Sequence, residues 1–437
     1  MYRLLGKFAS FALMATVSAY AAPGDVEFIV DHKISESEAD QINYVSLEKS
    51  GETILCGHGG GGAWVSVLAP SGQSKYTAVV AGIRDGASEA CWTVLTHEPS
   101  KTLIAGETNT HSLLGKEWGQ ESLPPPRRYE TTPHAALIAT LRPDGSTADK
   151  LVFGNFKKYY RNTFYRGVRV ADGYVLAGML TNEWPAFTRS GTIGVAALWV
   201  VKIDFAGALK WQYQLAEDGG DVLEVNRHHY FSQLFELPDG SLVLAVSMGR
   251  LAHRQQAGQR RLLGIDVKPQ NPGGVLMVRL APDGKELRRV WGGPDIFLAL
   301  RGNEIVSLGN PPRSDPSAIV VDRLETVTFD YDLNRKSSRI LEIGPQYFSI
   351  EGIAVAASGE LFAIGTYASR RGHREIALVQ ITAKELRVLK HFRSGQWGGI
   401  TRARDSDDFV VARLSTLPLG SPDMKRDIEL MKFKISR

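Results

Sequence analysis

"RGVRVADGYVLAG", residues 166–178, is the stretch that decides the fold of this chain. Two runs rich in β-branched and apolar residues flank an Ala-Asp-Gly turn, which is the pattern of an antiparallel β-hairpin. The same pattern recurs six more times, with turns near Gly51, Ser100, Asp239, Gly302, Gly359 and Asp407. Repeats every ~50 to 70 residues are typical of an array of small structural units.

A second type of hairpin alternates with the first, as in "ALIATLRPDGSTADKLVF" (136–153) and "LMVRLAPDGKELRRVW" (276–291). Its second strand is more polar, as expected at an outer sheet edge. One hairpin of each type makes a four-stranded antiparallel sheet, and seven such sheets around an axis make an all-β, seven-bladed β-propeller. The seventh sheet has only three strands, the last in "IELMKFKIS" (428–436). We therefore expect "VEFIVDHK" (26–33) to close it as the fourth strand.

The segment "LWVVKIDFAGALKWQY", residues 198–213, resembles the propeller repeat of secreted bacterial proteins. In that repeat, Trp-Val-Val-Lys-hydrophobic-Asp precedes a Gly turn and a closing Trp. The other repeats of this chain keep only the alternation and the turn. The resemblance implies the fold and no particular chemistry, because propellers have many functions.

The first 21 residues have the features of a signal peptide. Arg3 and Lys7 precede an uncharged apolar run, Phe8 to Val17, and Ala19-Tyr20-Ala21 supplies the small residues of a cleavage site. The apolar run is too short to span a bilayer. We therefore predict a periplasmic protein whose mature chain, residues 22–437, is a single propeller domain without a membrane span.

The formal net charge is +4. Removing residues 1–21, which contain two basic residues and no acid, halves it. So small a charge argues against a nucleic-acid-binding function.

Cys56 and Cys91 are the only cysteines. In an oxidising compartment an even count favours a disulfide, and both residues fall on strands expected to be neighbours. The alternative is two separate buried thiols.

The stretch "CGHGGGGAWVSV", residues 56–67, could belong to an esterase oxyanion loop or a phosphate cradle. The first needs a Gly-x-Ser-x-Gly nucleophile elbow, which the sequence lacks. The second needs Gly-Lys-Ser/Thr followed by a helix, whereas Ala63-Trp64-Val65 begins a strand. We interpret residues 57–62 as a tight connection between the second and third strands of the first blade, with close backbone packing.

We interpret the other candidate catalytic or metal-binding groups as structural. The Asp-Gly pairs at 144–145, 172–173, 239–240 and 283–284 occupy hairpin tips, where Asp accepts local hydrogen bonds and Gly takes positive φ. His228 and His229 are adjacent on an expected strand, so their side chains point to opposite faces. The sequence predicts no metal site and no cofactor.

Long insertions separate the two hairpins of blades two, three and four, at 108–134, 181–194 and 249–274, with shorter ones in blades six and seven. Because the hairpin turns all lie on one face of the ring, we expect these insertions on the other. They are rich in arginine and aromatic residues, which are enriched at binding hot spots. The alternative is solvated loops with a chance excess of arginine. The candidate partner-binding residues are Trp118, Arg127, Arg128, Tyr129, Trp184, Arg254, Arg260, Arg261, Arg370 and Arg371.

These features favour a non-enzymatic protein that binds another protein. An exported propeller with long insertions on one face resembles periplasmic immunity proteins. Such proteins neutralise toxins, including lipases, that rival bacteria inject through type VI secretion. The resemblance implies an inhibitor, monomeric when unbound, that occludes the acidic or phosphate-binding cleft of a toxin such as a secreted phospholipase. The alternatives are a propeller-scaffold hydrolase or lyase acting on a carbohydrate or lactone, and an envelope assembly scaffold.

Overall fold

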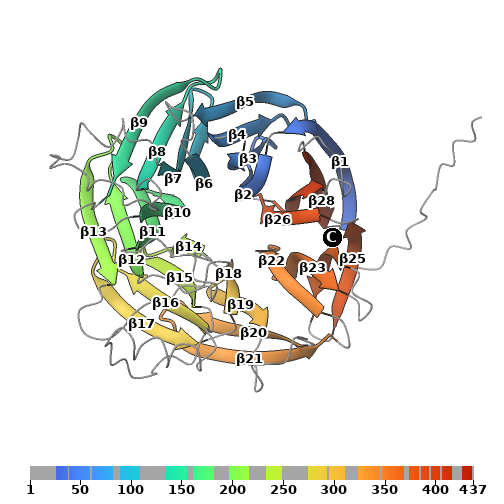
Figure 1. Cartoon of the computed structure of the whole chain (residues 1–437). Coiled ribbons are helices and arrows are strands. Elements are labelled where there is room, and N and C mark those ends of the chain that lie inside the picture. Colours follow the sequence, from blue (N-terminus) through green and yellow to red (C-terminus); the bar gives the residue numbers. More distant parts are fainter. Residues whose placement is uncertain are drawn as a thin grey trace, which may run out of the picture.

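The computed structural model describes residues 26–37, 39–59, 62–81, 89–108, 134–154, 161–181, 196–215, 233–248, 274–292, 295–310, 323–343, 347–368, 374–382, 385–392, 395–403, 406–415 and 426–435. These residues form seven four-stranded antiparallel sheets around a central axis (Figure 1). The predicted all-β, seven-bladed propeller is confirmed. The predicted signal peptide, residues 1–21, lies outside the described residues, so export stays a prediction.

In the first six blades the four strands follow one another from the axis outward. Blade 1 consists of β2 (Ala39–Leu47), β3 (Thr53–Gly59), β4 (Gly62–Leu68) and β5 (Ser74–Ala81). Blade 2 consists of β6 (Glu89–Glu98), β7 (Lys101–Thr108), β8 (Ala135–Leu141) and β9 (Thr147–Phe153). Blade 3 consists of β10 (Arg161–Val170), β11 (Gly173–Thr181), β12 (Ala196–Ile203) and β13 (Leu209–Leu215).

Blade 4 consists of β14 (Gln233–Glu236), β15 (Leu242–Met248), β16 (Gly274–Leu280) and β17 (Glu286–Gly292). Blade 5 consists of β18 (Asp295–Arg301), β19 (Glu304–Asn310), β20 (Arg323–Asp330) and β21 (Arg335–Glu342). Blade 6 consists of β22 (Tyr347–Val355), β23 (Leu361–Ala368), β24 (Arg374–Ile381) and β25 (Leu386–Phe392).

Blade 7 is built from both ends of the chain. It consists of β26 (Gly395–Arg402), β27 (Asp408–Ser415), β28 (Arg426–Ile435) and β1 (Val26–Ser37). The N-terminal β1 pairs antiparallel with β28, from Val26↔Ile435 to Ser37↔Arg426. The predicted closing strand, 26–33, is confirmed and extends further than expected. Figure 1 shows β1 as the outermost strand beside β28.

The alternation of strand direction defines two faces of the ring. Turns that join the first to the second strand, and the third to the fourth, lie on one face, here named the turn face. Connections from the second to the third strand lie on the opposite face, here named the loop face. Each innermost strand therefore runs from the loop face toward the turn face.

The hydrophobic core lies in layers between neighbouring blades. One layer packs Leu55 and Trp64 of blade 1 against Val410 and Leu430 of blade 7, and a corresponding layer lies at each of the other six blade interfaces. Blades are apolar on both sides because each contributes to two layers, which explains why their strands contain near-continuous apolar runs.

The innermost strands carry a β-bulge at a recurring position. In β2, β6, β10, β22 and β26, one extra residue has no partner on the second strand, which twists the innermost strand locally. These extra residues are Asn43, Trp92, Tyr165, Glu351 and Trp397.

The bulges explain a glycine that recurs at the end of the second hairpin run. Gly57, Gly106 and Gly178 each pair with the residue directly before the extra one. A Cβ at any of them would lie 1.8 Å from a backbone carbonyl oxygen of the innermost strand. Only glycine tolerates that approach.

The structural interpretation of residues 56–67 is therefore confirmed at Gly57. The strands are longer than expected, since β3 ends at Gly59 and β4 begins at Gly62. The connection between them is correspondingly shorter than the predicted 57–62.

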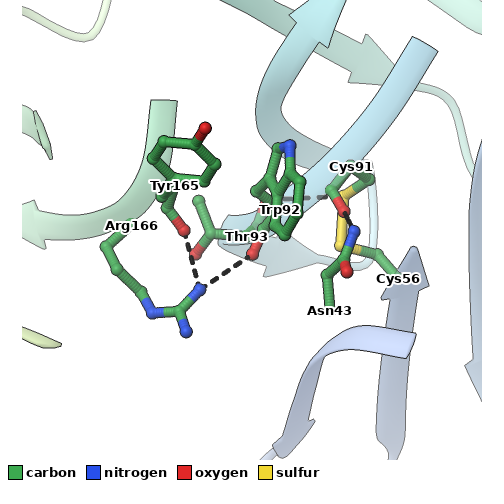
Figure 2. The surroundings of a disulfide bond; sticks show 7 residues. All are labelled: Asn43, Cys56, Cys91, Trp92, Thr93, Tyr165 and Arg166. Carbon is green, nitrogen blue, oxygen red and sulfur yellow. Dashed lines mark hydrogen bonds between the residues drawn. A yellow bond between two sulfur atoms is a disulfide. The ribbon is translucent and has the colours of Figure 1, made fainter. Parts of the chain in front are cut away.

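A disulfide joins blade 1 to blade 2. Cys56 on β3 and Cys91 on β6 are bonded, with a Cα–Cα distance of 5.7 Å, and both are fully buried. The predicted disulfide is confirmed. Asn43 on β2 donates a hydrogen bond to the carbonyl oxygen of Cys91 (2.8 Å), which adds a second link between the same blades (Figure 2).

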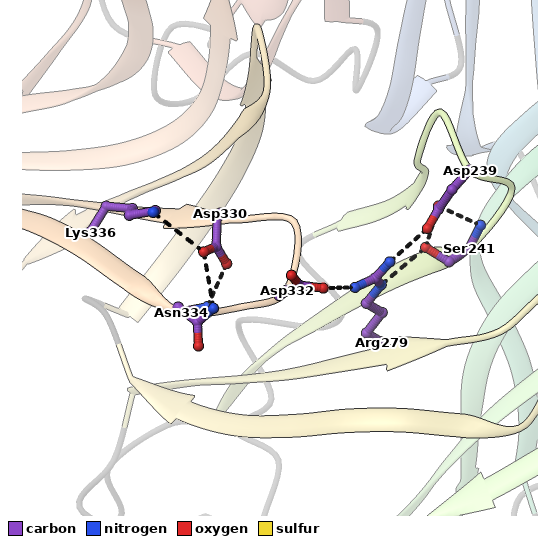
Figure 3. Close-up of polar contacts among 7 residues, drawn as sticks. All are labelled: Asp239, Ser241, Arg279, Asp330, Asp332, Asn334 and Lys336. Atoms are coloured by element: carbon purple, nitrogen blue, oxygen red, sulfur yellow. Dashed lines mark hydrogen bonds and ion pairs between the residues drawn. The ribbon is translucent and has the colours of Figure 1, made fainter.

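A cation at one position of the third strand connects successive blades on the turn face. Arg279 on β16 pairs with Asp239 of its own blade (2.6 Å) and with Asp332 in the β20–β21 turn of blade 5 (Figure 3). Lys432 on β28 donates to the carbonyl oxygens of Gly51 and Pro70 in blade 1 (2.9 and 3.1 Å).

Lys202 and Trp211, the lysine and the closing tryptophan of the 198–213 repeat, have comparable structural roles. Lys202 pairs with Asp172 at 2.8 Å, and Trp211 Nε1 donates to the carbonyl oxygen of Pro282 in blade 4 at 2.9 Å. The Trp211 ring packs so closely on Gly284 that a Cβ there would lie 2.6 Å from it.

Three of the four Asp-Gly pairs at hairpin tips make the predicted local hydrogen bonds, while in the fourth, Asp172-Gly173, the carboxylate pairs with Lys202 and the glycine has φ +157°. Asp144, Asp239 and Asp283 each accept a hydrogen bond from the backbone N–H two residues later, at 2.8 to 3.1 Å. The glycines that follow them have φ between +77° and +88°. The Ser241 hydroxyl also bonds Asp239 and holds the pKa of that carboxyl below its ordinary value.

Removing the disulfide should lower stability without changing the fold. In the chain-entropy model, opening a loop of this size costs about 3–4 kcal/mol. We expect Cys56→Ala/Cys91→Ala to lower the free energy of unfolding in urea by that amount. Dithiothreitol should destabilise the wild type similarly and leave the double variant unchanged; a further loss in the variant would contradict the assignment.

Gly178→Ala should destabilise the protein by about 2 to 3 kcal/mol, because the new methyl group overlaps the carbonyl oxygen of Thr163. Gly292→Ala is the matched control, because nothing lies within 4 Å of a Cβ at that position. Its effect should stay below about 1 kcal/mol. Urea unfolding measures both, and equal losses would refute the bulge explanation.

Candidate functional site

The centre of the ring contains a cavity of about 400 Å³. Its wall is formed by the innermost strands of all seven blades, β2, β6, β10, β14, β18, β22 and β26, which are the terminal strands of their sheets. One edge of each innermost strand therefore has no neighbouring strand and faces the axis (Figure 1). A cavity of this volume is in the range of small-ligand sites, ~300 to 1,000 Å³.

The cavity lies in the half of the channel nearer the turn face. It is lined by residues 44–45 of β2, 166–167 of β10, 298–300 of β18, 353–355 of β22 and 400–402 of β26. All of these lie in the second half of strands that run toward that face. The cavity is thus displaced from the face that carries the predicted partner-binding loops.

Arg166 on β10 is a charged group in the cavity wall. Its Nη1 donates to the carbonyl oxygens of Tyr165 (2.8 Å) and Trp92 (3.5 Å), the two residues that the bulges of β10 and β6 remove from strand pairing. Figure 2 shows both bonds arising from a single guanidinium nitrogen. Burial lowers the pKa of Arg166 to about 10, so it is charged at neutral pH.

Tyr44 on β2 also lines the cavity. Burial raises the pKa of Tyr44 to about 12, against the opposing effects of a hydrogen bond with Ser46 and the charge of Arg166. At neutral pH its phenol is protonated. Tyr44 is therefore suited to donate a hydrogen bond and poorly suited to act as a general base, which works best with a pKa near the operating pH.

The remaining polar side chains of the lining are Thr93, Gln233, Thr401 and Arg402. Arg402 Nη1 lies 3.7 Å from Asp407 Oδ1. The Thr93 hydroxyl is buried and has no hydrogen-bond partner among the described residues. Nothing in the sequence patterns pointed to this site, because its residues occupy strands whose local sequence only predicts β-structure.

The ten predicted partner-binding residues, Trp118 to Arg371, lie outside the described residues, as do His228 and His229. Of the three long loops, the structure describes only the strand residues at which each loop begins and ends, here named the loop roots. Thr108↔Ala135, Thr181↔Ala196 and Met248↔Gly274 are the paired residues from which the three long segments leave and to which they return. These roots lie on the loop face of three consecutive blades.

A buried polar network fixes the root of the blade 2 segment. Glu107 accepts a hydrogen bond from Thr163 of blade 3 (2.7 Å) and lies 3.4 Å from His134 Nδ1. Asn162 of blade 3 donates its backbone N–H to the carbonyl oxygen of His134 (2.9 Å). Glu107 and His134 are 5% and 7% exposed, so both ends of segment 108–134 are held against blade 3.

Within the part of the chain that the structure describes, no three His, Cys, Asp or Glu side chains are grouped so as to hold a metal ion. The described residues also include no helix with the length and apolar character of a bilayer crossing.

The sequence matches no protein-family model and no curated protein sequence. Among solved structures, the chain is similar to one from a mitotic checkpoint complex, with a TM-score of 0.47, 9% identity and 99% of both chains covered. It is also similar to an ulvan lyase, a polysaccharide lyase, with a TM-score of 0.40, 8% identity, and 74% of this chain and 76% of that chain covered. A third is an α-L-arabinanase of Penicillium chrysogenum, with a TM-score of 0.35, 10% identity, and 57% and 76% covered. Such distant likenesses do not decide between a binding protein and an enzyme.

Glu107→Ala should destabilise the protein by about 1 to 3 kcal/mol, because it leaves the buried Thr163 hydroxyl without its acceptor. Glu375→Ala is the control, since Glu375 and its partner His391 are half exposed and such pairs contribute little. Thermal unfolding measures both. Equal shifts in Tm would show that the Glu107 network does not anchor the loop root.

Proposed function

We propose that this protein is a non-enzymatic, exported binding protein that grips another protein on its loop face. The observation that carries the proposal is the position of the loop roots. Three of the longest connections leave from the same face of consecutive blades. Their sequences supply the arginine and aromatic residues that dominate binding hot spots.

The buried network at Glu107 supports the same proposal. A binding surface gains affinity when its supporting elements are held in place before the partner arrives. The root of segment 108–134 is fixed to the innermost strand of blade 3 through Thr163 and Asn162. The loop face is thus held in place at the two ends of segment 108–134.

The central cavity favours binding over proton transfer. The ionisable lining groups are Tyr44, Arg166 and Arg402. Burial holds the pKa of Tyr44 well above neutral, and an arginine is a poor base. A hydrolase or lyase acting on a carbohydrate or lactone, the main alternative, would have to draw its catalytic base from elsewhere.

The narrower proposal concerns the partner and the compartment. We propose that the protein acts in the periplasm as an immunity protein, monomeric until it binds. Its loop arginines and aromatics would enter the acidic or phosphate-binding cleft of an injected toxin, such as a phospholipase, and block access of the substrate. The arginine-rich and aromatic segments that leave from the loop face and the predicted signal peptide support this proposal. The competing proposal is that the protein is an envelope assembly scaffold.

Arg260→Glu/Arg261→Glu should weaken capture of the partner at least ~10-fold, because hot-spot arginines contribute most of the binding energy. Capture from a periplasmic extract followed by a titration of the identified protein measures this. Tm should be nearly unchanged, as expected for substitutions that remove partner contacts and no contact within the propeller.

The matched control is Lys285→Glu/Arg288→Glu, a reversal of the same charge on residues exposed at the β16–β17 hairpin. It should leave capture unchanged. Equal weakening by both variants would show non-specific charge attraction. A captured toxin that stays fully active in the complex would refute the inhibitor proposal, and turnover of a carbohydrate or lactone by the purified protein would favour the enzyme.

A further inference from the structure

We propose that the central cavity is a second binding site, for a small hydroxycarboxylate, and that Arg166 binds its carboxylate group. This inference does not depend on the proposed protein-binding function of the loop face.

The cavity wall carries more positive than negative charge. Two guanidinium groups, Arg166 and Arg402, line the cavity, and no Asp or Glu is among its described lining residues. Arg402 already has a counter-charge, because its Nη1 forms an ion pair with Asp407 at 3.7 Å. Within the described residues, Arg166 has carbonyl oxygens as its only acceptors.

The environment of Arg166 favours a bound anion. Arg166 is only partly exposed, and a guanidinium that loses part of its hydration is destabilised unless it is hydrogen-bonded and its charge is compensated. The two bulge carbonyls satisfy Nη1 and compensate no charge. A bound carboxylate would supply the missing counter-charge.

The hydrogen bonds of Arg166 leave one side of its guanidinium available to a ligand. Nη1 makes both hydrogen bonds, which fixes the guanidinium plane (Figure 2). Nη2 and Nε have no partner among the described residues, and they form the side of the guanidinium that binds a carboxylate with two parallel hydrogen bonds. The strand bulges thus orient Arg166 for a ligand.

The rest of the lining defines the body of the ligand. The protonated phenol of Tyr44 is a donor, and Gln233 and Thr401 add further polar groups. Such a wall prefers a molecule with several hydroxyl or carboxyl oxygens. The volume of about 400 Å³ limits it to a small molecule.

Isothermal titration of the full chain with malate tests the proposal, with sorbitol and inorganic phosphate as comparison ligands at equal ionic strength. We expect saturable 1:1 binding of malate, no binding of sorbitol, and phosphate binding at least ~10-fold weaker than malate. Phosphate can also accept two hydrogen bonds from a guanidinium, but it lacks the hydroxyl and second carboxyl group that would contact the rest of the cavity wall. Malate should also raise Tm, as a ligand of the native state does.

Arg166→Gln should reduce malate affinity at least ~10-fold, whereas Arg288→Gln, on the exposed outer strand β17, should not change it. Because Arg166 also bonds two bulge carbonyls, its variant could lose stability. Gln233→Leu and Tyr44→Phe are therefore tested in parallel, and each should weaken malate binding several-fold in a protein with wild-type Tm.

Three results would overturn the proposal: no saturable binding of malate by the wild type, malate affinity unaffected by Gln233→Leu and Tyr44→Phe, or a folded Arg166→Gln variant with unchanged affinity. Equal binding of malate and phosphate would overturn the carboxylate assignment.

Discussion

The structure depends on backbone hydrogen bonds between the two ends of the chain. β1, near the N-terminus, pairs with β28 near the C-terminus and completes the seventh sheet. Without this pairing, blade 7 would have three strands and an exposed edge, and blade 1 would lose a firmly held neighbour. Because every blade buries an apolar layer on each side, the ring is stable only when it is closed. Lys432 on β28, bonded to turn carbonyls of blade 1, strengthens the same junction.

Closure also creates the central cavity. Seven innermost strands direct their unpaired edges toward one axis, and the bulges at Trp92 and Tyr165 turn two carbonyl groups toward Arg166. The glycines that oppose the bulges, such as Gly106 and Gly178, make this geometry possible, since a Cβ there would collide with the backbone. A local feature of each hairpin thus determines the shape and charge of the channel wall.

The two proposed binding surfaces are separate. The cavity lies toward the turn face, where short hairpin turns are connected across blades by Arg279, Lys202 and Lys432. The long connections leave from the loop face, where Glu107 and His134 fix one root against blade 3. A substitution in one surface can therefore be made without altering the other, and a small molecule in the channel and a protein on the loop face need not compete.

Local patterning determined the architecture. The alternation of apolar runs with turns such as Ala171-Asp172-Gly173 fixes each hairpin through nearest-neighbour geometry, so the number of blades, the closing strand and the Cys56–Cys91 bond all followed from the sequence. The cavity did not follow, because Tyr44, Arg166 and Arg402 are far apart in the chain and occupy ordinary strand positions. Only ring closure brings them to one axis and places the partly exposed Arg166 in the cavity wall. The sequence determined which segments pair with each other, and the tertiary structure decided which side chains line one central cavity, since that depends on how seven sheets pack together.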